Sequence, residues 1–250
     1  MGVFAVVKRK SLVMVAVAVV AVAIIVAGSV LGSQTAVAEK RLPVYSVEDD
    51  NKIAITFDAS WGAERTKGIV DCLTEKGVKA TFFLTGIWIN DYPTETIYIH
   101  EHGMEIGNHS HHHYNMGKMN KQKIQNEIVD VNRQIHYLTG VYPTVFRAPF
   151  GDYGNTLIET LDEMGMRCIQ WDVDSLDWKG LSRDELYARI VKGVKGGSII
   201  LCHNNSDHIL EALPKVLDDL TRAGYTFVTV SELLEGKSGA IDREGKLHAK

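Results

Sequence analysis

The stretch KIAITFDASWGAERTKGIVDCLTEKGVKATFFL, residues 52–84, determines the fold class of this chain. Residues 52–57 are strand-like, residues 63–76 have the pattern of a helix, and residues 79–84 form a second strand-like run. Gly77 follows the helix and is a good C-cap, because glycine readily adopts the left-handed conformation in which helices commonly end. A strand, a helix and a second strand in this order form the repeating unit of a parallel sheet.

The same alternation continues to about Leu234. In the longest helix apolar residues recur at three- and four-residue steps, Pro214 is expected to kink or break a later helix, and Ser231 is expected to cap a short last helix. Further strands are expected at residues 104–108, 145–146, 167–171, 198–202 and 226–230, and further helices at residues 92–102, 120–138, 155–164, 182–192 and 207–223. About seven repeats favour an irregular (β/α) barrel over an open doubly wound sheet, and no glycine-rich nucleotide-binding loop is found.

The N-terminal residues 1–38 are interpreted as a targeting or anchoring segment. A basic cluster at residues 8–10 precedes an uncharged apolar run at residues 12–31, which is as long as a membrane-spanning helix. The cleavable signals of secreted proteins usually have a shorter apolar core, although Ala36-Val37-Ala38 would suit a signal peptidase. We therefore favour an uncleaved membrane anchor over a cleaved signal, and in both cases the rest of the chain is expected outside the cytoplasm.

The remaining chain is expected to form a polar linker at residues 39–51, one domain at residues 52–235 and a polar, disordered tail at residues 236–250. The net charge of −4 and the absence of a basic stripe give no reason to expect a nucleic-acid partner. The three cysteines are too few and too widely spaced for a disulfide framework, and we expect buried thiols.

A histidine cluster, NHSHHH at residues 108–113, places four of the ten histidines within five residues. Neutral imidazole is the commonest protein ligand for zinc-like metals. His109 and His113 are four residues apart and would share one face of a helical turn, so that they could hold one ion together. The cluster predicts a metal site at the end of the strand at residues 104–108, and the alternative is a polar loop without a metal.

Chemically reactive side chains follow most of the predicted strands. In a barrel the C-terminal ends of the strands open on one face, and that face holds the active site. Each side chain alone also has an ordinary structural interpretation, as a helix N-cap, a surface cation, a solvated acid or a core histidine. Together they favour an active site. The residues are Asp58, His109, Arg147, Asp174, Asp177 and His203.

Five motifs occur in order along the chain: TFDASWG at residues 56–62, His109-Ser110-x-x-His113, RAPF at residues 147–150, Asp177-Trp178 and Leu201-x-His203. This ordered set resembles the polysaccharide deacetylases of carbohydrate esterase family 4, which share the NodB homology domain. The sequence of the first motif, with Ala-Ser-Trp-Gly after the aspartate, is similar to that of the sporulation-associated PdaB branch of bacterial peptidoglycan deacetylases. The resemblance implies a NodB-type barrel and a hydrolase that acts on carbon–nitrogen bonds other than peptide bonds.

The resemblance also implies a role for each motif residue. Asp58 would be the general base, and Arg147 would hold it in place and keep it ionised. His203 would protonate the leaving amine, and Asp177 would orient His203 and favour its protonated form. The substrate-binding residues would be Trp178 and Leu201, which wall the acetyl pocket, and Pro149, Phe150 and Gly151, which shape the sugar groove.

The metal site departs from the family pattern. The resemblance assigns a divalent metal, expected to be zinc, to His109 and His113, where it would polarise the acetamide carbonyl. At Ala59 the family usually has an aspartate that completes the site, and two imidazoles alone should hold the metal more weakly. The third ligand could be Asp58 or a histidine at residues 111–112, the metal could be more hydrated, or catalysis could be lost.

The sequence leads to a main functional hypothesis and two rivals. The main hypothesis is an exported, metal-dependent N-deacetylase, acting on N-acetylated amino sugars of peptidoglycan, with a possible role at the spore wall. The rivals are a catalytically impaired, membrane-anchored glycan-binding protein and an O-acetyl esterase on a xylan-like polysaccharide. We expect a monomer whose partners are the glycan substrate and, through the N-terminal helix, the membrane.

Overall fold

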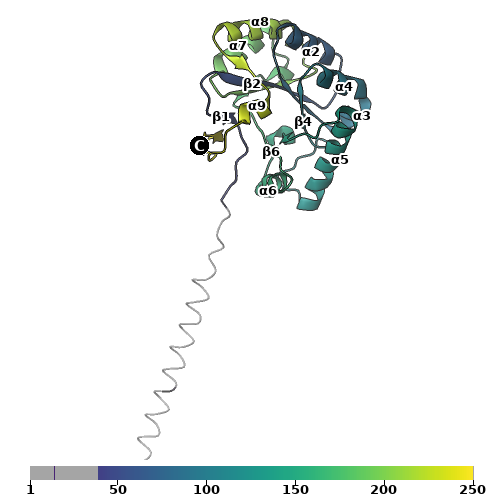
Figure 1. The fold of residues 1–250 in the computed structure, drawn as a ribbon, viewed down its shortest axis with the longest axis vertical. Coiled ribbons are helices and arrows are strands. Elements are labelled where there is room, and N and C mark those ends of the chain that lie inside the picture. Colours follow the sequence, from purple (N-terminus) through teal and green to yellow (C-terminus); the bar gives the residue numbers. More distant parts are fainter. Residues whose placement is uncertain (1–13, 15–38, 250) are drawn as a thin grey trace, which may run out of the picture. The chain divides into compact units, whose positions relative to one another are not determined.

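The structure is a computed structural model that describes residue 14 and residues 39–249 (Figure 1). The chain divides into two units, residues 1–39 and 40–250, and the second is described below. Apart from Met14, the apolar segment predicted to be a membrane anchor lies outside the described residues. Within the part of the chain that the structure describes, no helix is long and apolar enough to cross a membrane.

A curled sheet of parallel strands forms the centre of the domain, as the repeating pattern predicts. The strands pair in the order β6-β5-β4-β3-β2-β8-β7, and β9 pairs with the first residues of β2, before β3 joins that strand. Their bounds are β2 Lys52–Ala59, β3 Thr81–Leu84, β4 Glu105–Asn108, β5 Val145–Phe146, β6 Arg167–Cys168, β7 Val173–Asp174, β8 Ile199–His203 and β9 Thr226–Phe227.

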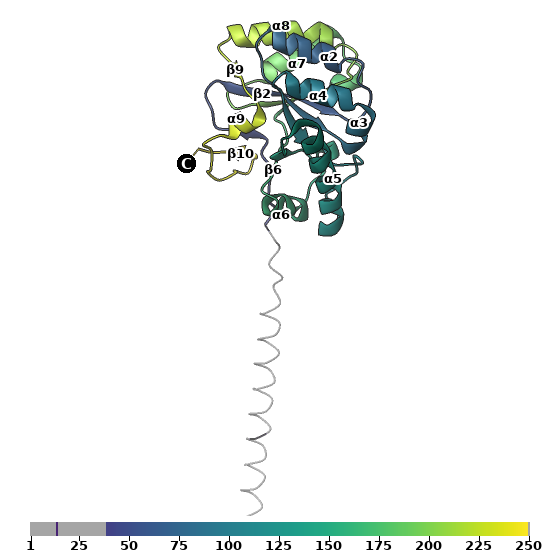
Figure 2. The ribbon, with the colours of Figure 1, turned by 45° about the vertical axis from the view of Figure 1, so that its right-hand side comes forward.

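Helices cover the outer face of the sheet (Figures 1 and 2). They pack against one another in the order α7-α8-α2-α4-α5-α6. Their bounds are α2 Thr66–Glu75, α3 Gly86–Asp91, α4 Pro93–Glu101, α5 Lys121–Thr139, α6 Asn155–Glu163, α7 Arg183–Gly193, α8 Ile209–Arg222 and α9 Val230–Leu234, with 3-10 helices η1 Pro149–Gly151 and η2 Asp177–Lys179.

The alternation of side chains along β2 separates the core from the site. Ile53, Ile55 and Phe57 are fully buried in the cluster between the sheet and the outer helices. Because successive side chains of a strand point to opposite faces, Thr56 and Asp58 point to the inside of the curled sheet. The strand thus places a carboxylate at the inner, C-terminal end of an otherwise apolar segment.

The predicted barrel is confirmed in part, because the sheet is parallel and curled. The sheet is not closed into a ring, because β6 and β7 do not pair among the described residues. The segment predicted as a linker lies at this opening. Val44 bridges Ile169, and its N–H donates to the carbonyl of Cys168 at 2.9 Å. The N–H of Val47 donates to the carbonyl of Gly197 at 2.9 Å, and a Cβ at Gly197 would lie 1.7 Å from the Val47 oxygen.

The prediction of a disordered tail from Gly236 is also wrong. Strand β10, Lys246–Leu247, pairs in parallel with β1, Ser46–Val47. Leu247 is buried against Val44 and Val230 of the same apolar cluster. Leu247 and Ile241 pack against this cluster, the edge of β1 pairs with β10, and the Ala249 N–H donates to Glu48, and none of these contacts produces a periodic pattern in the sequence.

Three local predictions also need correction. Thr229, and not Ser231, caps α9 and forms a capping box with Glu232. Helix α8 continues through Pro214 without a break. A short helix, α3, precedes α4, because the side chain of Thr85 caps it by accepting a hydrogen bond from the backbone of Trp88.

Candidate active site

A cleft of about 700 Å³ opens at the C-terminal ends of the strands. The structure brings together most of the residues that the sequence singles out: Asp58, His109, His113, Phe150, Asp174, Asp177, Trp178, Leu201 and His203 line the cleft. Arg147 lies fully buried behind Asp58, and neither Pro149 nor Gly151 lines the cleft. Sequence reasoning quoted Trp61 in the first motif without giving it a role, and it missed Trp171 and the segment 204–207, which also line the cleft.

Asp58 is held from behind by Arg147. The Arg147 Nη1 donates to Asp58 Oδ1 at 2.7 Å and to Thr56 Oγ1 at 2.8 Å, and its Nη2 donates to the carbonyl of Gln170 at 3.1 Å. Burial by itself would raise the pKa of Asp58, but the charge and hydrogen bond of Arg147, together with the neighbouring His109 and His203, outweigh it, so the pKa lies below its usual value. Asp58 is therefore ionised at neutral pH, with Oδ2 turned away from the arginine.

The same arginine also orients His109. The Nδ1 of His109 lies 2.9 Å from the Arg147 carbonyl oxygen, which can only accept, so this nitrogen carries the proton. The Nε2 then presents a lone pair, 3.4 Å from Asp58 Oδ2. Burial lowers the pKa of His109 despite the neighbouring carboxylate, which keeps the ring neutral and able to bind a metal.

His113 reaches the cleft from a loop, so the prediction of a shared helical turn is wrong. Asn108 Oδ1 accepts from the N–H of Ser110, and Ser110 Oγ accepts from the N–H of His113. These bonds hold Ser110 and His113 at φ of 66° and 58°. The rings of His113 and His109 still lie 5.0 Å apart between centroids. Burial lowers the pKa of His113 to about 4.

Backbone strain is concentrated around this cleft. The non-glycine residues with positive φ in the described chain are Ser110, His113, Phe150 and Leu176. Two of them, His113 and Phe150, line the cleft, and the other two adjoin lining residues. Such conformations persist only where the surrounding structure enforces them, and they cluster at functional sites.

His203 and Asp177 form a second histidine–acid pair, beside Asp58 on the neighbouring strand β8. The Nδ1 of His203 lies 2.6 Å from Asp177 Oδ1, and the His203 N–H donates to Asp177 Oδ2 at 2.7 Å. Burial by itself would lower the pKa of His203, but Asp177 and then Asp58 outweigh it, so the pKa is raised. In the sheet His203 is the direct partner of Asp58.

Glu127 is a further positioning residue that sequence reasoning missed. Its carboxylate accepts from the N–H groups of His111 and His112 and lies 2.7 Å from His112 Nδ1. The signal is present in the sequence, because Glu127 falls on the apolar face of α5, between Ile124 and Ile128. Neither His111 nor His112 lines the cleft, so neither is placed to be a third metal ligand.

The donor set fits a divalent metal held by two neutral imidazoles and water. The Nδ1 of His113 is buried without a hydrogen-bond partner, and the Nε2 of His109 faces Asp58. Among the described residues no group of three His, Cys, Asp or Glu side chains is placed to hold a metal. Ala59 is fully buried in the apolar cluster that contains Phe57, so position 59 supplies no donor.

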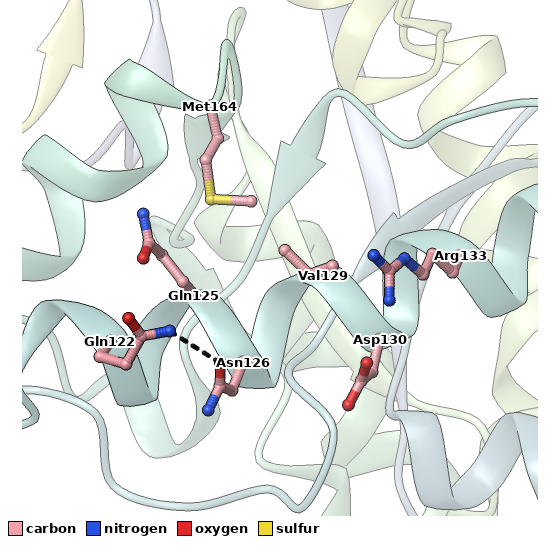
Figure 3. Close-up of a pocket in the computed structure, with 7 residues that line it drawn as sticks. All are labelled: Gln122, Gln125, Asn126, Val129, Asp130, Arg133 and Met164. Carbon is pink, nitrogen blue, oxygen red and sulfur yellow. Dashed lines mark hydrogen bonds between the residues drawn. The ribbon is translucent and has the colours of Figure 1, made fainter.

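A second cavity, of about 450 Å³, lies along α5 (Figure 3). Figure 3 shows Met164 above the polar side chains of the helix, with Gln122 donating to Asn126 at 3.1 Å. Its lining residues include no histidine and no buried acid. The site for chemistry is therefore the cleft at the strand ends.

An ionised buried carboxylate, a histidine–aspartate pair and two neutral imidazoles at the end of a parallel sheet define a hydrolytic site. The comparisons with known proteins identify the family. The family model described as polysaccharide deacetylase matches residues 46–169. A peptidoglycan-N-acetylglucosamine deacetylase of Bacillus cereus is 32% identical, over 74% of this chain and 68% of that protein. The chain belongs to the polysaccharide deacetylases of carbohydrate esterase family 4, as its five motifs predict.

Other relatives include both active and inactive proteins. The peptidoglycan-N-acetylmuramic acid deacetylase PdaA of Bacillus subtilis is 30% identical over 74% of this chain and 72% of that protein. A solved CE4 family pseudoenzyme from Bacillus anthracis is 29% identical, with a TM-score of 0.75 over 83% of this chain and 73% of that chain. A mutant of that pseudoenzyme is described as having restored enzymatic activity. The chain spans only 60% and 40% of two other relatives.

Proposed function

We propose that this protein is a metal-dependent N-deacetylase that removes acetyl groups from the N-acetylated amino sugars of peptidoglycan. The observation that carries the proposal is the placement of Asp58 and His203 as direct partners on adjacent strands, both lining one cleft. Each has its own orienting residue, Arg147 for Asp58 and Asp177 for His203. A protein that only binds sugars needs no such pair.

The geometry supports a general base and a general acid. Asp58 Oδ2, the oxygen that Arg147 does not hold, accepts a proton from the attacking water. The raised pKa of His203 favours its protonated form, and Asp177 holds its Nδ1, which leaves Nε2 for the cleft. His203 donates that proton to the departing nitrogen, which an amide needs because an amine is a poor leaving group.

His109 and His113 are the residues that would hold the metal. A divalent metal bound there would supply Lewis acidity toward the acetamide carbonyl. The protein's own contribution is to keep both rings neutral by burial and to fix the His109 tautomer through the Arg147 carbonyl. Zinc is the expected metal, because imidazole nitrogen is a preferred zinc ligand.

Peptidoglycan is proposed as the substrate because relatives that align with most of the domain are named as peptidoglycan deacetylases, of N-acetylglucosamine in one case and N-acetylmuramic acid in another. The basic and apolar residues at positions 8–31 support delivery across the membrane, to the cell wall or the spore wall. The deciding experiment is acetate release from purified wall before and after chelation of the metal. Asp58→Asn should reduce the rate by at least about 100-fold, the size of a general-base contribution, and an unchanged rate would refute the assigned base.

A catalytically impaired glycan-binding protein is the second candidate, and Ala59 is the observation that favours it. The substitution Ala59→Asp separates the two, with Ala59→Asn as the matched control that adds similar volume without a charge. A large gain in bound metal and in rate for the aspartate variant alone would show that the native site is impaired. Unchanged values would support activity with two imidazoles.

A further inference from the structure

Strand β10 pairs with β1 over two residues only. At the two ends of this pairing, the N–H of Tyr45 donates to the carbonyl of Gly245 at 2.8 Å, and the N–H of Glu48 donates to the carbonyl of Leu247 at 2.7 Å. Leu247 is the one buried side chain of the strand. Because a pair of such short strands is marginally stable by itself, side-chain contacts around it decide whether β10 stays in place.

A histidine that follows β10 lies between two carboxylates. The Nε2 of His248 lies 2.9 Å from Oδ2 of Asp242, in the turn before β10, and its Nδ1 lies 3.4 Å from Oε2 of Glu48, which follows β1. An ionised carboxylate can only accept, so both contacts are favourable only when both ring nitrogens carry a proton. The imidazole is then a cation that joins the turn to the segment containing β1.

The neighbouring groups keep both carboxylates ionised. The N–H of Ala249 donates to Glu48 at 3.0 Å and lowers the pKa of that carboxyl group, and the hydrogen bond to His248 lowers the pKa of Asp242. The same bond to Asp242 raises the pKa of His248. The other charged residues of segments 44–49 and 237–249 are Asp49 and Lys237, which pair with each other at 3.4 Å, and Arg243, Glu244 and Lys246.

We propose that His248 is a pH-sensitive latch, which holds β10 on β1 while the ring is charged and frees the strand when the ring loses its proton. Loss of the proton turns a lone pair toward one of the two carboxylates, so an attraction becomes a repulsion. Because the folded-state pKa is raised, the contribution of the latch is complete below the unfolded pKa and is lost as pH rises through the folded pKa. The strand is therefore held in mildly acidic solution and freed in alkaline solution.

The segment that β10 covers reaches the active site through backbone bonds. The carbonyl of Val44 accepts from the N–H of Gln170 at 2.7 Å, and the carbonyl of Gln170 accepts from Arg147 at 3.1 Å. Arg147 in turn holds Asp58. Release of β10 removes Leu247 from the apolar cluster that contains Val44. The latch thus acts on the outermost support of the arginine behind Asp58.

The test is hydrogen–deuterium exchange of the full-length protein, corrected for the intrinsic exchange rate at each pH. Protection of segments 44–49 and 239–249 should fall by about two- to tenfold from about pH 6 to about pH 9, the range expected for one or two exposed ion pairs. Helix α2 should keep its protection. His248→Gln, which stays neutral, should have the low alkaline level at both pH values. His208→Gln is the matched control, because His208 forms a similar pair with Glu211, 3.1 Å away at the start of α8.

Two outcomes would overturn the latch. One is equal protection of the two segments at both pH values in the native protein. The other is a His248→Gln variant that keeps the full pH dependence of the native protein. The measurement involves no turnover, so its result does not depend on the proposed function.

Discussion

The pair formed by His203 and Asp177 makes a quantitative prediction about pH dependence. Asp177→Asn keeps an oxygen that can accept from the imidazole Nδ1 but removes the negative charge 2.6 Å away. A hydrogen bond to a charged partner contributes about 1.5–3 kcal/mol. Since 1.36 kcal/mol corresponds to one pKa unit, the pKa of His203 should fall by about 1 to 2 units. Burial, which lowers the pKa, is then opposed only by the more distant charges of Asp58 and Asp174.

The assay is the pH profile of acetate release from wall material. If protonated His203 is the acid, the alkaline limb of the profile should move to lower pH by the same 1 to 2 units, about the shift in its pKa. Asp207→Asn is the matched control, because Asp207 lines the same cleft but pairs with Arg65 and not with His203. An unshifted alkaline limb in a folded Asp177→Asn variant would refute the assignment of His203 as the acid.

A measurement of stability checks the same pair without turnover. Because the folded-state pKa of His203 is raised, its pairing stabilises the fold fully below the unfolded pKa, and this contribution is lost as pH rises through the folded pKa. The difference in the free energy of unfolding between native protein and Asp177→Asn should therefore be largest at acidic pH and should shrink toward alkaline pH. A constant difference would contradict the raised pKa.

Three further predictions follow from the neighbouring contacts. Arg147→Ala should lower the free energy of unfolding by about 3–5 kcal/mol in urea titrations, because it leaves the Asp58 carboxylate buried without its partner; a loss below 1 kcal/mol would contradict this. Because the pKa of His113 is about 4, protons compete with zinc for this ring only in acidic solution. Zinc binding followed by calorimetry should therefore be lost nearer pH 4 than pH 6.5. Glu127→Ala should weaken zinc binding by about 10-fold, because its carboxylate holds the N–H groups of the two residues between the proposed ligands His109 and His113, whereas exposed Asp130→Ala on the same helix should not.

Much of the sheet could be predicted from the sequence because its strands are apolar runs followed by reactive residues. The alternation in β2, from Ile53 to Asp58, identifies both the core face and the site face. The capping box of Ser182 and Glu185 and the helix end at Gly140 are also found where the sequence places them. These features depend on residues close together in the chain, so they can be predicted directly from the sequence.

The features that the sequence did not reveal depend on contacts between distant residues. Val44 is fixed by its bridge to Ile169 at the opening of the sheet, and Leu247 is fixed by the pairing of β10 with β1. No short sequence pattern encodes either contact. The loop at His113 is set by the side chains of Asn108 and Ser110, which compete with the backbone bonds of a helical turn. Glu127 was visible only as an acid on an apolar helix face.

The segment at the opening between β6 and β7 has a practical consequence for making the protein. A recombinant fragment cut at the predicted limits, residues 52–235, would lack Val44, Val47 and Leu247, and would expose Ile169 and Ile199 to solvent. It would also leave unpaired sheet edges, which favour association between copies. Fragments for crystallisation or assay should therefore begin no later than residue 40 and keep the C-terminal residues through 249.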